Sequence, residues 1–318
     1  MHKALGTLRP GKRRLMVALC ALAVVAFNAP SGTAAGLRSH AVHSPAAKPQ
    51  ITIGSKNFTE QLLVGNMEAD LLQAAGYPVV RKLNLAGTAV CQAALVRGDI
   101  DTYVEYTGTG LTTILKLPTI NNPAKVYKVV KKQYAKQYHL EWLKTWGFND
   151  TYAMIMTKAE ATKYNVKTLS DLAKVSSSLV IGGTQEFLAR PDDGLPGMSK
   201  AYNMSFKDQK GLDPGLLYQA LTSGQVDVAS GFSTDGQISA DHLVVIKDNK
   251  RYFPPYYAAP VVRQQTLKKS PGIAKILNKL AGKLSNKEMA KLNYAVEGSK
   301  KDPAAVAKAF LKQIHLIK

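Results

Sequence analysis

The sequence predicts an α/β protein made of two similar lobes, and three observations support this fold class. The chain has 318 residues, 46% of them hydrophobic, which is enough for two globular domains. Segments with strand-like and helix-like apolar patterns alternate along it, which is typical of a largely parallel sheet. Finally, LVRGDIDTYVEYTGTG (residues 95–110) returns 126 positions later as LTSGQVDVASGFSTDG (residues 221–236).

This repeat indicates two structurally similar units. In each copy a helix end is followed by a turn of the form Gly-x-[Ile/Val]-Asp, a strand and a small-residue loop that carries an aromatic residue, Tyr106 in one copy and Phe232 in the other. Ligands of open α/β sheets bind at the carboxyl ends of strands. We therefore expect two lobes that present these rings to a shared cleft. The alternative is a chance similarity between two amphipathic segments.

The N-terminus has the features of an export signal. Lys12, Arg13 and Arg14 precede an apolar run over 15–27, which is followed by small residues up to Ala35. A charged region, a short hydrophobic core and small residues at a cleavage site define a secretory signal peptide. We assign 1–35 to the signal peptide and 36–49 to a flexible leader; an uncleaved anchor is the alternative.

The first lobe begins as a strand–helix alternation. Thr59 is placed to cap a helix whose apolar face includes Leu63, Met67 and Leu71, and Gly76 is placed to end it. The elements expected in this part of the chain are a strand at 50–53, a helix at 60–75, a strand at 79–83, a helix at 90–97, a strand at 100–104 and a helix at 123–139.

The remaining elements follow from the same patterns. GTQEFLARPDDGLPG, which contains Arg190, is predicted to be a long polar loop, and YFPPYYAAP a return loop. Pro214 is placed in the first turn of a helix, where proline is favoured. The elements expected are strands at 152–156, 179–182 and 243–246, helices at 168–174 and 213–223, and three C-terminal helices at 271–280, 286–296 and 302–314.

Charge and motifs exclude several classes of function. The net charge of +20 permits nucleic-acid or anionic-lipid partners, but the basic residues are scattered and no nucleic-acid motif accompanies them. The chain has no nucleophile elbow, P-loop, dinucleotide fingerprint or metal-ligand spacing. We predict a protein that is not an enzyme, with no cofactor, no metal and no nucleic-acid partner.

Aromatic residues at strand ends favour a binding function. Tyr106, Tyr152, Phe232 and Tyr256 all lie where a strand ends or in a loop, where core packing does not require a ring. Several ring faces around one volume suit a poorly hydrated cation such as a quaternary ammonium. For any single ring, packing in the core is an equally good explanation, so the prediction depends on the set.

Long blocks of the chain resemble the osmoprotectant-binding proteins of ABC importers. They include ITIGSKNFTEQLLVGNMEADLL, LNLAGTAVCQAALVRGDIDTYVEYTGTG, GFNDTYAM, ARPDDGLPG, FSTDGQI and DNKRYFPPYYAAPVV, in order from residue 51 onwards. These proteins bind glycine betaine, proline betaine or choline and have the type II periplasmic-binding-protein fold. The resemblance implies that lobe 1 consists of 50–150 plus 257–318 and that lobe 2 consists of 151–256.

The resemblance also implies roles for particular residues. Tyr106, Tyr152, Phe232 and Tyr256 would form an aromatic cage, with the Asp150 backbone carbonyl against the ammonium methyl groups. Phe232 departs from the commonest version of the motif, which has tyrosine there. Lys56, Thr109 and Arg190 would hold a ligand carboxylate, a role that suits an ammonium, a hydroxyl and a guanidinium. The alternatives are a surface position for Lys56 and an ion pair with Asp192 or Asp193 for Arg190.

We therefore expect a monomeric periplasmic receptor that delivers a quaternary amine, glycine betaine or proline betaine first, to a membrane permease and its ATPase subunit. Ligand contacts with both lobes would drive closure. Choline or carnitine is the alternative ligand, and a ligand-sensing partner of a signalling receptor is the alternative function.

Overall fold

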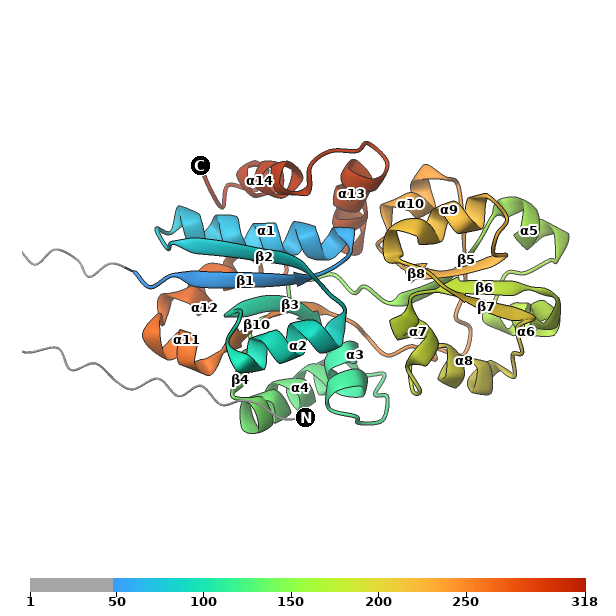
Figure 1. Ribbon diagram of the computed structural model, residues 1–318, viewed down its shortest axis with the longest axis horizontal. Helices are drawn as coiled ribbons and strands as arrows, with labels where there is room; N and C mark the ends of the chain where they lie inside the picture. Colours follow the sequence, from blue (N-terminus) through green and yellow to red (C-terminus); the bar gives the residue numbers. More distant parts are fainter. Residues whose placement is uncertain (1–47) are drawn as a thin grey trace, which may run out of the picture. The chain divides into compact units, whose positions relative to one another are not determined.

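The computed structural model describes residues 48–318, which contain two five-stranded sheets (Figure 1). The first sheet has the order β2-β1-β3-β10-β4, with β1 at Ile51–Lys56, β2 at Val79–Ala86, β3 at Thr102–Tyr106, β4 at Leu140–Trp142 and β10 at Ala258–Arg263. The second has the order β7-β6-β8-β5-β9, with β5 at Tyr152–Met156, β6 at Val180–Gly183, β7 at Asp208–Gly211, β8 at Val228–Phe232 and β9 at Val244–Ile246. The expected signal peptide (1–35) and the leader up to residue 47 lie outside the described residues.

Helices flank both sheets. Those of the first sheet are α1 (Thr59–Ala74), α2 (Thr88–Arg97), α3 (Thr107–Thr109), which continues into a π-helical turn at Gly110–Ile114, and α4 (Pro123–Tyr138). Those of the second are α5 (Lys158–Lys163), α6 (Leu169–Val175), α7 (Gln185–Ala189), α8 (Leu195–Tyr202), α9 (Leu217–Thr222) and α10 (Gly236–Ala240). The C-terminal helices are α11 (Gln264–Lys269), α12 (Gly272–Leu277), α13 (Asn286–Glu297) and α14 (Pro303–Gln313). Single-turn 3-10 helices lie at Ser176–Ser178, Pro214–Leu216 and Asn278–Leu280.

The α/β class is confirmed, but the largely parallel sheet is wrong. β1 pairs in parallel with β2 and β3, and β6 pairs in parallel with β7 and β8. In contrast, β10 runs antiparallel to β3 and β4, and β5 runs antiparallel to β8 and β9. Both sheets are therefore mixed, because each receives one long strand from a segment that crosses over from the other sheet.

The repeat found in the sequence has the same structure in both copies. Strand β8 starts and ends 126 positions after β3, at 228 against 102 and at 232 against 106. Asp101 accepts a 2.8 Å hydrogen bond from the backbone N–H of Thr52 in β1. Asp227 accepts a 2.7 Å hydrogen bond from the backbone N–H of Val180 in β6. The two copies of the repeat therefore fold alike and make equivalent contacts.

Two segments connect the sheets, and they meet each other. The chain crosses between β4 and β5 and returns between β9 and β10. Asn149 and Tyr257, one from each segment, form an isolated antiparallel bridge. The backbone N–H of Asp150 donates to the Tyr256 carbonyl at 3.1 Å. Two of the predicted binding residues, Asp150 and Tyr256, therefore lie on the crossing segments themselves. The lobe boundaries at 150 and 257 remain a prediction.

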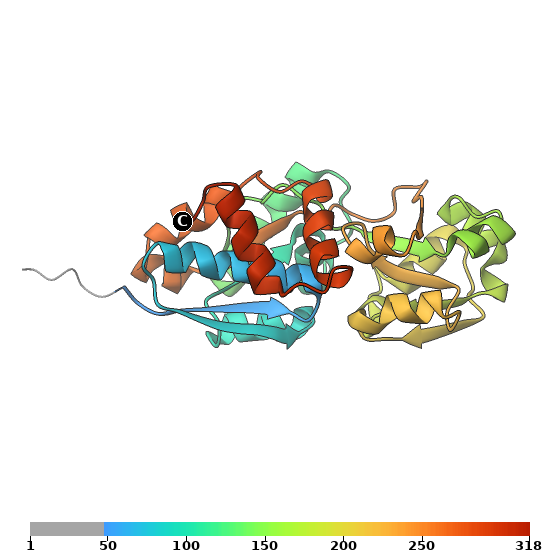
Figure 2. The same ribbon diagram turned by 90° about the horizontal axis from the view of Figure 1, so that it is seen from above.

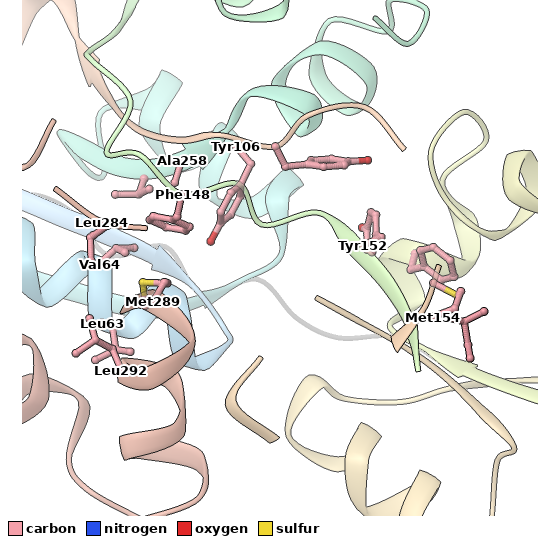
Figure 3. Packing of buried hydrophobic residues seen from close by; sticks show 14 of the residues in the cluster. Leu63, Val64, Tyr106, Phe148, Tyr152, Met154, Ala258, Leu284, Met289 and Leu292 are labelled. Carbon is pink, nitrogen blue, oxygen red and sulfur yellow. The ribbon is translucent and has the colours of Figure 1, made fainter. Parts of the chain in front are cut away.

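Helix α1 is the central helix of the first sheet's core. In Figure 2, α13 and α14 lie across it, and Figure 3 shows Leu63 and Val64 of α1 close to Met289 and Leu292 of α13. These side chains are buried and belong to one apolar cluster. The expected Thr59 cap is wrong: α1 begins at Thr59, and Phe58 occupies the N-cap position without a side-chain hydrogen bond. The side chain of Phe58 lines the cavity described below.

Three further expectations from the sequence are wrong. The predicted polar loop around Arg190 contains α7 and the start of α8, and the small-residue loop after Tyr106 is helical. The predicted return loop ends in β10, whose Pro260 pairs with Val104 of β3. Pro260 lacks an N–H group but still accepts a hydrogen bond from the backbone N–H of Leu143 at 2.9 Å. The polar residues and prolines of these segments argue against helices and strands in the sequence, but tertiary contacts stabilise regular structure there.

Candidate functional site

A cavity of about 210 Å³ lies where strands of both sheets end. It is lined by residues at or just after the carboxyl ends of β1, β2, β3, β6, β7 and β8, which is the usual ligand-binding edge of such sheets. All eight residues predicted from the sequence line this one cavity, namely Lys56, Tyr106, Thr109, Asp150, Tyr152, Arg190, Phe232 and Tyr256. The structure brings the whole set together, and their role in ligand binding stays a prediction.

The predicted rings are in contact with one another. Tyr152 stacks on Phe232, with ring centroids 5.2 Å apart and planes 26° apart. Tyr152 also meets Tyr256 edge-on, with centroids 5.6 Å apart and planes 83° apart. Tyr106 joins the group through another ring, that of Phe58. The three tyrosines are almost fully buried, and Phe232 is half-buried. The cavity wall is therefore an aromatic surface assembled from β3, β5, β8 and the returning segment.

Phe58 is an aromatic lining residue that the sequence reading missed. It stacks on Tyr106 with centroids 6.3 Å apart and on Phe232 with centroids 5.4 Å apart. It bridges ring systems that come from different sheets. Its position between the end of β1 and the start of α1, two residues after Lys56, was the signal that could have revealed it.

Gly108 positions one of the cage rings. A Cβ atom at Gly108 would lie 2.6 Å from ring atoms of Tyr256 and 3.0 Å from the Pro255 carbonyl oxygen. The ring of Tyr256 therefore rests directly on the backbone of α3, and only glycine allows this approach. The Tyr256 hydroxyl donates to Asp193 at 2.6 Å, which fixes the other end of the side chain.

Lys56 is buried and already has an acidic partner. Its Nζ lies 2.6 Å from Glu105 Oε1, and neither side chain is more than 6% exposed. The same ammonium lies 5.1 Å from the centre of the Tyr106 ring, within range of a cation–π contact. The surface position considered for Lys56 is therefore wrong. The ion pair holds a positive charge at the cavity wall without leaving it uncompensated.

Arg190 lies at the end of α7 and forms the ion pair with Asp193 that the sequence left as an alternative. Its Nε donates to Asp193 Oδ1 at 2.8 Å, and Nη2 donates to the other carboxylate oxygen. Weaker bonds run from Nη1 to the Tyr152 hydroxyl at 3.2 Å and to Glu186 at 3.3 Å. The guanidinium centre lies 5.5 Å from the Tyr152 ring centre. A bidentate pair of this kind fixes the orientation of the guanidinium.

Glu186 adds a charged carboxylate to the cavity wall. Burial opposes its ionisation, but the neighbouring charges of Lys56 and Arg190 outweigh burial and lower its pKa. Its Oε2 accepts a 3.3 Å hydrogen bond from the backbone N–H of Thr88, the first residue of α2. This second-sheet carboxylate therefore caps a first-sheet helix.

Acidic groups behind the cage were also missed in the sequence. Glu60 in α1 accepts a 2.7 Å hydrogen bond from the Tyr106 hydroxyl. Thr234, after β8, lies with its hydroxyl 2.5 Å from Glu60 and 2.6 Å from Asp150. No local sequence pattern joins residues 60, 150 and 234, because the crossing segment brings them together.

Comparison with known proteins identifies the family. A model of the "substrate binding domain of ABC-type glycine betaine transport system" matches residues 49–313. The chain belongs to this family. The family's fold is also seen in a crystal structure of a glycine betaine/carnitine/choline ABC transporter protein, which is 35% identical with a TM-score of 0.70 and covers 85% of this chain and 100% of that one.

Two curated members of the glycine betaine substrate-binding family illustrate the range of relatives. The carnitine transport binding protein OpuCC of Listeria monocytogenes is 39% identical over 269 residues, which are 84% of this chain and 87% of that protein. The glycine-betaine-binding protein of Pseudomonas aeruginosa is 35% identical over 278 residues, which are 84% of this chain and 88% of that protein. Within residues 48–318, each helix is too short or too polar to span a bilayer.

Proposed function

We propose that this chain is the extracytoplasmic substrate-binding protein of an ABC importer and that it binds a quaternary ammonium osmoprotectant, with glycine betaine as the first ligand to test and proline betaine next. The observation that carries the proposal is the convergence of the four predicted rings on one cavity. The family and its relatives support the ligand class. The proposal is for a binding protein without catalytic activity.

The aromatic surface suits a permanently charged, poorly hydrated nitrogen. Each ring face contributes roughly 0.5–2 kcal/mol to a desolvated cation. Several rings together with shape burial reach about −8 kcal/mol, which corresponds to micromolar affinity. The rings of Tyr152, Phe232 and Tyr256 are already packed against one another, so little side-chain entropy remains to be lost on binding. The Asp150 backbone carbonyl completes the proposed ammonium site.

Lys56, Thr109 and Arg190 are proposed to hold the ligand carboxylate. Both cations line the cavity, but each is paired with a protein carboxylate. Arg190 keeps its shorter bonds for Asp193 and has longer bonds, of 3.2 and 3.3 Å, to Tyr152 and Glu186. We propose that a ligand carboxylate replaces these longer bonds, because weak hydrogen bonds are the easiest to exchange.

Choline or carnitine is the second candidate ligand. The acidic partners of Lys56 and Arg190, together with Glu186, reduce the positive charge that the cavity offers to a carboxylate. Choline has no carboxylate and therefore does not need these cations. The carboxylates around Lys56 and Arg190 therefore favour a cation without a carboxylate, such as choline, over a betaine.

The proposed setting is a two-lobed monomer outside the cytoplasm. An N-terminal signal over 1–35 would export the chain, and a permease with its ATPase subunit would receive the ligand. Lobe 1 would be 50–150 with 257–318, and lobe 2 would be 151–256. The aromatic residues come from both sheets, so a bound ligand would hold the two lobes together.

Replacing Phe232 with alanine tests the cage with the least disturbance, because this ring is half-buried and has no polar atoms. We expect Phe232→Ala to weaken glycine betaine binding about two- to thirtyfold in calorimetry, since it removes one ring face worth roughly 0.5–2 kcal/mol. Tyr164→Ala is the matched control: Tyr164 is also half-buried, but it does not line the cavity. Equal affinities in wild type and Phe232→Ala would refute the cage.

A further inference from the structure

Glu60 is buried directly behind the proposed cage. It is 2% exposed, and its Oε1 lies 2.7 Å from the hydroxyl of Tyr106, a cage ring that lines the cavity. Gln61 Nε2 donates to the same hydroxyl at 3.1 Å, which leaves the single Tyr106 hydroxyl proton to be donated to Glu60. Glu60 thus contacts the cage through one hydrogen bond and does not itself line the cavity.

The position of the Thr234 hydroxyl indicates that one of two neighbouring carboxyl groups is protonated. Its oxygen lies 2.5 Å from Glu60 Oε2 and 2.6 Å from Asp150 Oδ1. A hydroxyl has one proton and can donate to only one of these oxygens. The other contact requires a proton on the carboxyl group itself. One of the two acids is therefore protonated whenever this arrangement is present.

The surrounding donors identify Glu60 as the ionised member of the pair. Glu60 accepts from Tyr106, and Asn293 Nδ2 donates to its Oε2 at 3.3 Å. Among the described residues, Asp150 has only Thr234 as a donor, through its hydroxyl and its backbone N–H, whereas Glu60 has donors from three residues. The assignment of protons that fits these contacts is a row of two hydrogen bonds, in which the Asp150 carboxyl group donates to the Thr234 hydroxyl and this hydroxyl donates to Glu60. Burial followed by the charges of Glu60 and Asp235 raises the pKa of Asp150 well above its usual range.

Glu60 itself titrates near neutrality. Burial raises its pKa to about 7, against the opposing effect of hydrogen bonds from Thr234, Tyr106 and Asn293. The other ionisable groups of this region are mostly acidic. Asp235 in the loop after β8 has a pKa raised to about 8, first by burial and then by the charge of Glu297.

Charged groups on the neighbouring elements complete this environment. Glu297 at the end of α13 accepts from the backbone N–H groups of Gly236 and Gln237 at 2.9 and 3.2 Å, and the charge of Lys300 acts on it. Tyr218 of α9 donates to Asp235. On the cavity side, Lys56 of β1 is paired with Glu105 of β3. Glu60 therefore faces acids and neutral donors, while the nearest cations are engaged with other carboxylates.

We propose that Glu60 is the titratable counter-charge of this site, so that a quaternary cation binds with release of the proton that Glu60 holds below neutral pH. This inference rests on the proposed function. A cation near the Tyr106 ring stabilises the Glu60 carboxylate at the hydroxyl end of that ring and lowers the pKa of Glu60 in the complex. Affinity then falls as pH decreases through about 7, and it levels off above that pH. If the pKa of Glu60 is one unit lower in the complex than in the free protein, affinity for the cation is about tenfold lower at low pH than at high pH.

Calorimetry from pH 5.5 to 8.5 tests the proposal, with glycine betaine and choline as probes and two buffers of different ionisation enthalpy. We expect wild-type affinity to fall about tenfold from pH 8 to pH 5.5, with proton release near pH 6.5 and none at pH 8.5. Glu60→Gln keeps the shape but cannot ionise. It should bind at the wild type's low-pH affinity at every pH, without proton release.

Glu68→Gln is the matched control. Glu68 is also fully buried in α1 and also has a pKa raised by burial, to about 8, but it bonds Thr102 in the core and does not line the cavity. This variant should keep the wild-type pH profile of binding. An equal pH profile in wild type and Glu60→Gln, or proton release that persists in Glu60→Gln, would overturn the proposal.

Thr234→Val provides a second test if Glu60→Gln does not fold. Without the hydroxyl, Glu60 loses its closest donor, so its pKa rises and the midpoint of the affinity profile must move to higher pH. An unchanged midpoint would contradict the proposal. Binding of a probe by wild type at all pH values with no proton release would reject only this inference. Failure of wild type to bind either probe at pH 8 would reject the proposed function itself, and this inference with it.

Discussion

Arg190 and Asp193 form the contact on which several parts of the site converge. Asp193 accepts from Tyr256 on the returning segment at 2.6 Å and from Thr112 next to α3 at 2.7 Å. Arg190 Nη2 also approaches the Thr112 hydroxyl, at 3.2 Å. An Arg–carboxylate pair between α7 and α8 is thereby joined to the first sheet's side of the cavity. Removal of this ion pair should lower both the stability of the fold and the affinity for the ligand.

The carboxylate role of Arg190 separates two ligands. We expect Arg190→Ala to weaken glycine betaine binding by about tenfold or more while weakening choline binding much less, because choline has no carboxylate for the guanidinium to bind. Choline is the internal control for misfolding, since loss of Arg190 leaves Asp193 buried without its cation. Equal losses for the two ligands, measured by calorimetry on one protein preparation, would remove Arg190 from carboxylate recognition.

The location of a residue beside the cavity was predictable where its position within an element carries the signal. Tyr106, Tyr152 and Phe232 are at strand ends, and the repeat predicts equivalent positions for Tyr106 and Phe232. Phe58 and Glu60 were missed because their contacts come from other segments: Phe58 meets Phe232, and Glu60 meets Thr234, 174 positions away. Contacts of that separation leave no local pattern in one sequence.

At the scale of elements, the long helices and several short elements, such as strands β5 and β9, were predicted well, whereas helices α7 and α8 and strand β10 were not. Helices α1, α4 and α13, each of 12 or 16 residues, were predicted with their positions nearly correct. Helices α7 and α8 were missed because five and eight residues contain too few turns for an apolar period, and Pro191 with Gly194 suggests a loop. Strand β10 was missed because Pro260 argues against a central strand.

Helix α1 contains a buried acid that should make folding stability depend on pH. Burial raises the pKa of Glu68 from an ordinary 4.5 to about 8, so the folded protein favours the protonated form. The stability that this preference gives is complete below pH 4.5 and is lost as pH rises towards 8. Each unit of difference between the pKa of Glu68 in the folded protein and in the unfolded protein contributes about 1.4 kcal/mol at most to the free energy of unfolding.

Glu68→Gln should therefore flatten the pH dependence of stability. We expect the fall in unfolding free energy between pH 5 and pH 9 to shrink by about 1–3 kcal/mol in this variant, because glutamine has no proton to lose. Urea denaturation at both pH values provides the measurement. Glu160→Gln is the surface control, since Glu160 contacts exposed Lys163. A pH dependence as steep in Glu68→Gln as in wild type would exclude Glu68 as its source.

At the scale of the whole described chain, both sheets contribute residues to the site. Residues beside each sheet also form hydrogen bonds with helices beside the other sheet. Glu186, beside the second sheet, caps α2 of the first sheet. Glu297 in α13, which packs on α1, binds the backbone N–H groups at the start of α10 beside the second sheet. The first of these contacts lies in the wall of the aromatic cavity. The two-lobed α/β plan was predictable from the repeat, whereas such contacts between lobes were not.

The central claim is that the rings recognise the charge on nitrogen and not merely its shape. Calorimetry with glycine betaine and with 3,3-dimethylbutanoate, in which carbon replaces the nitrogen, tests this claim most directly. If about three ring faces each contribute roughly 1 kcal/mol through the charge, glycine betaine should bind about a hundredfold more tightly than its carbon analogue. Equal affinities for the two compounds would contradict the account.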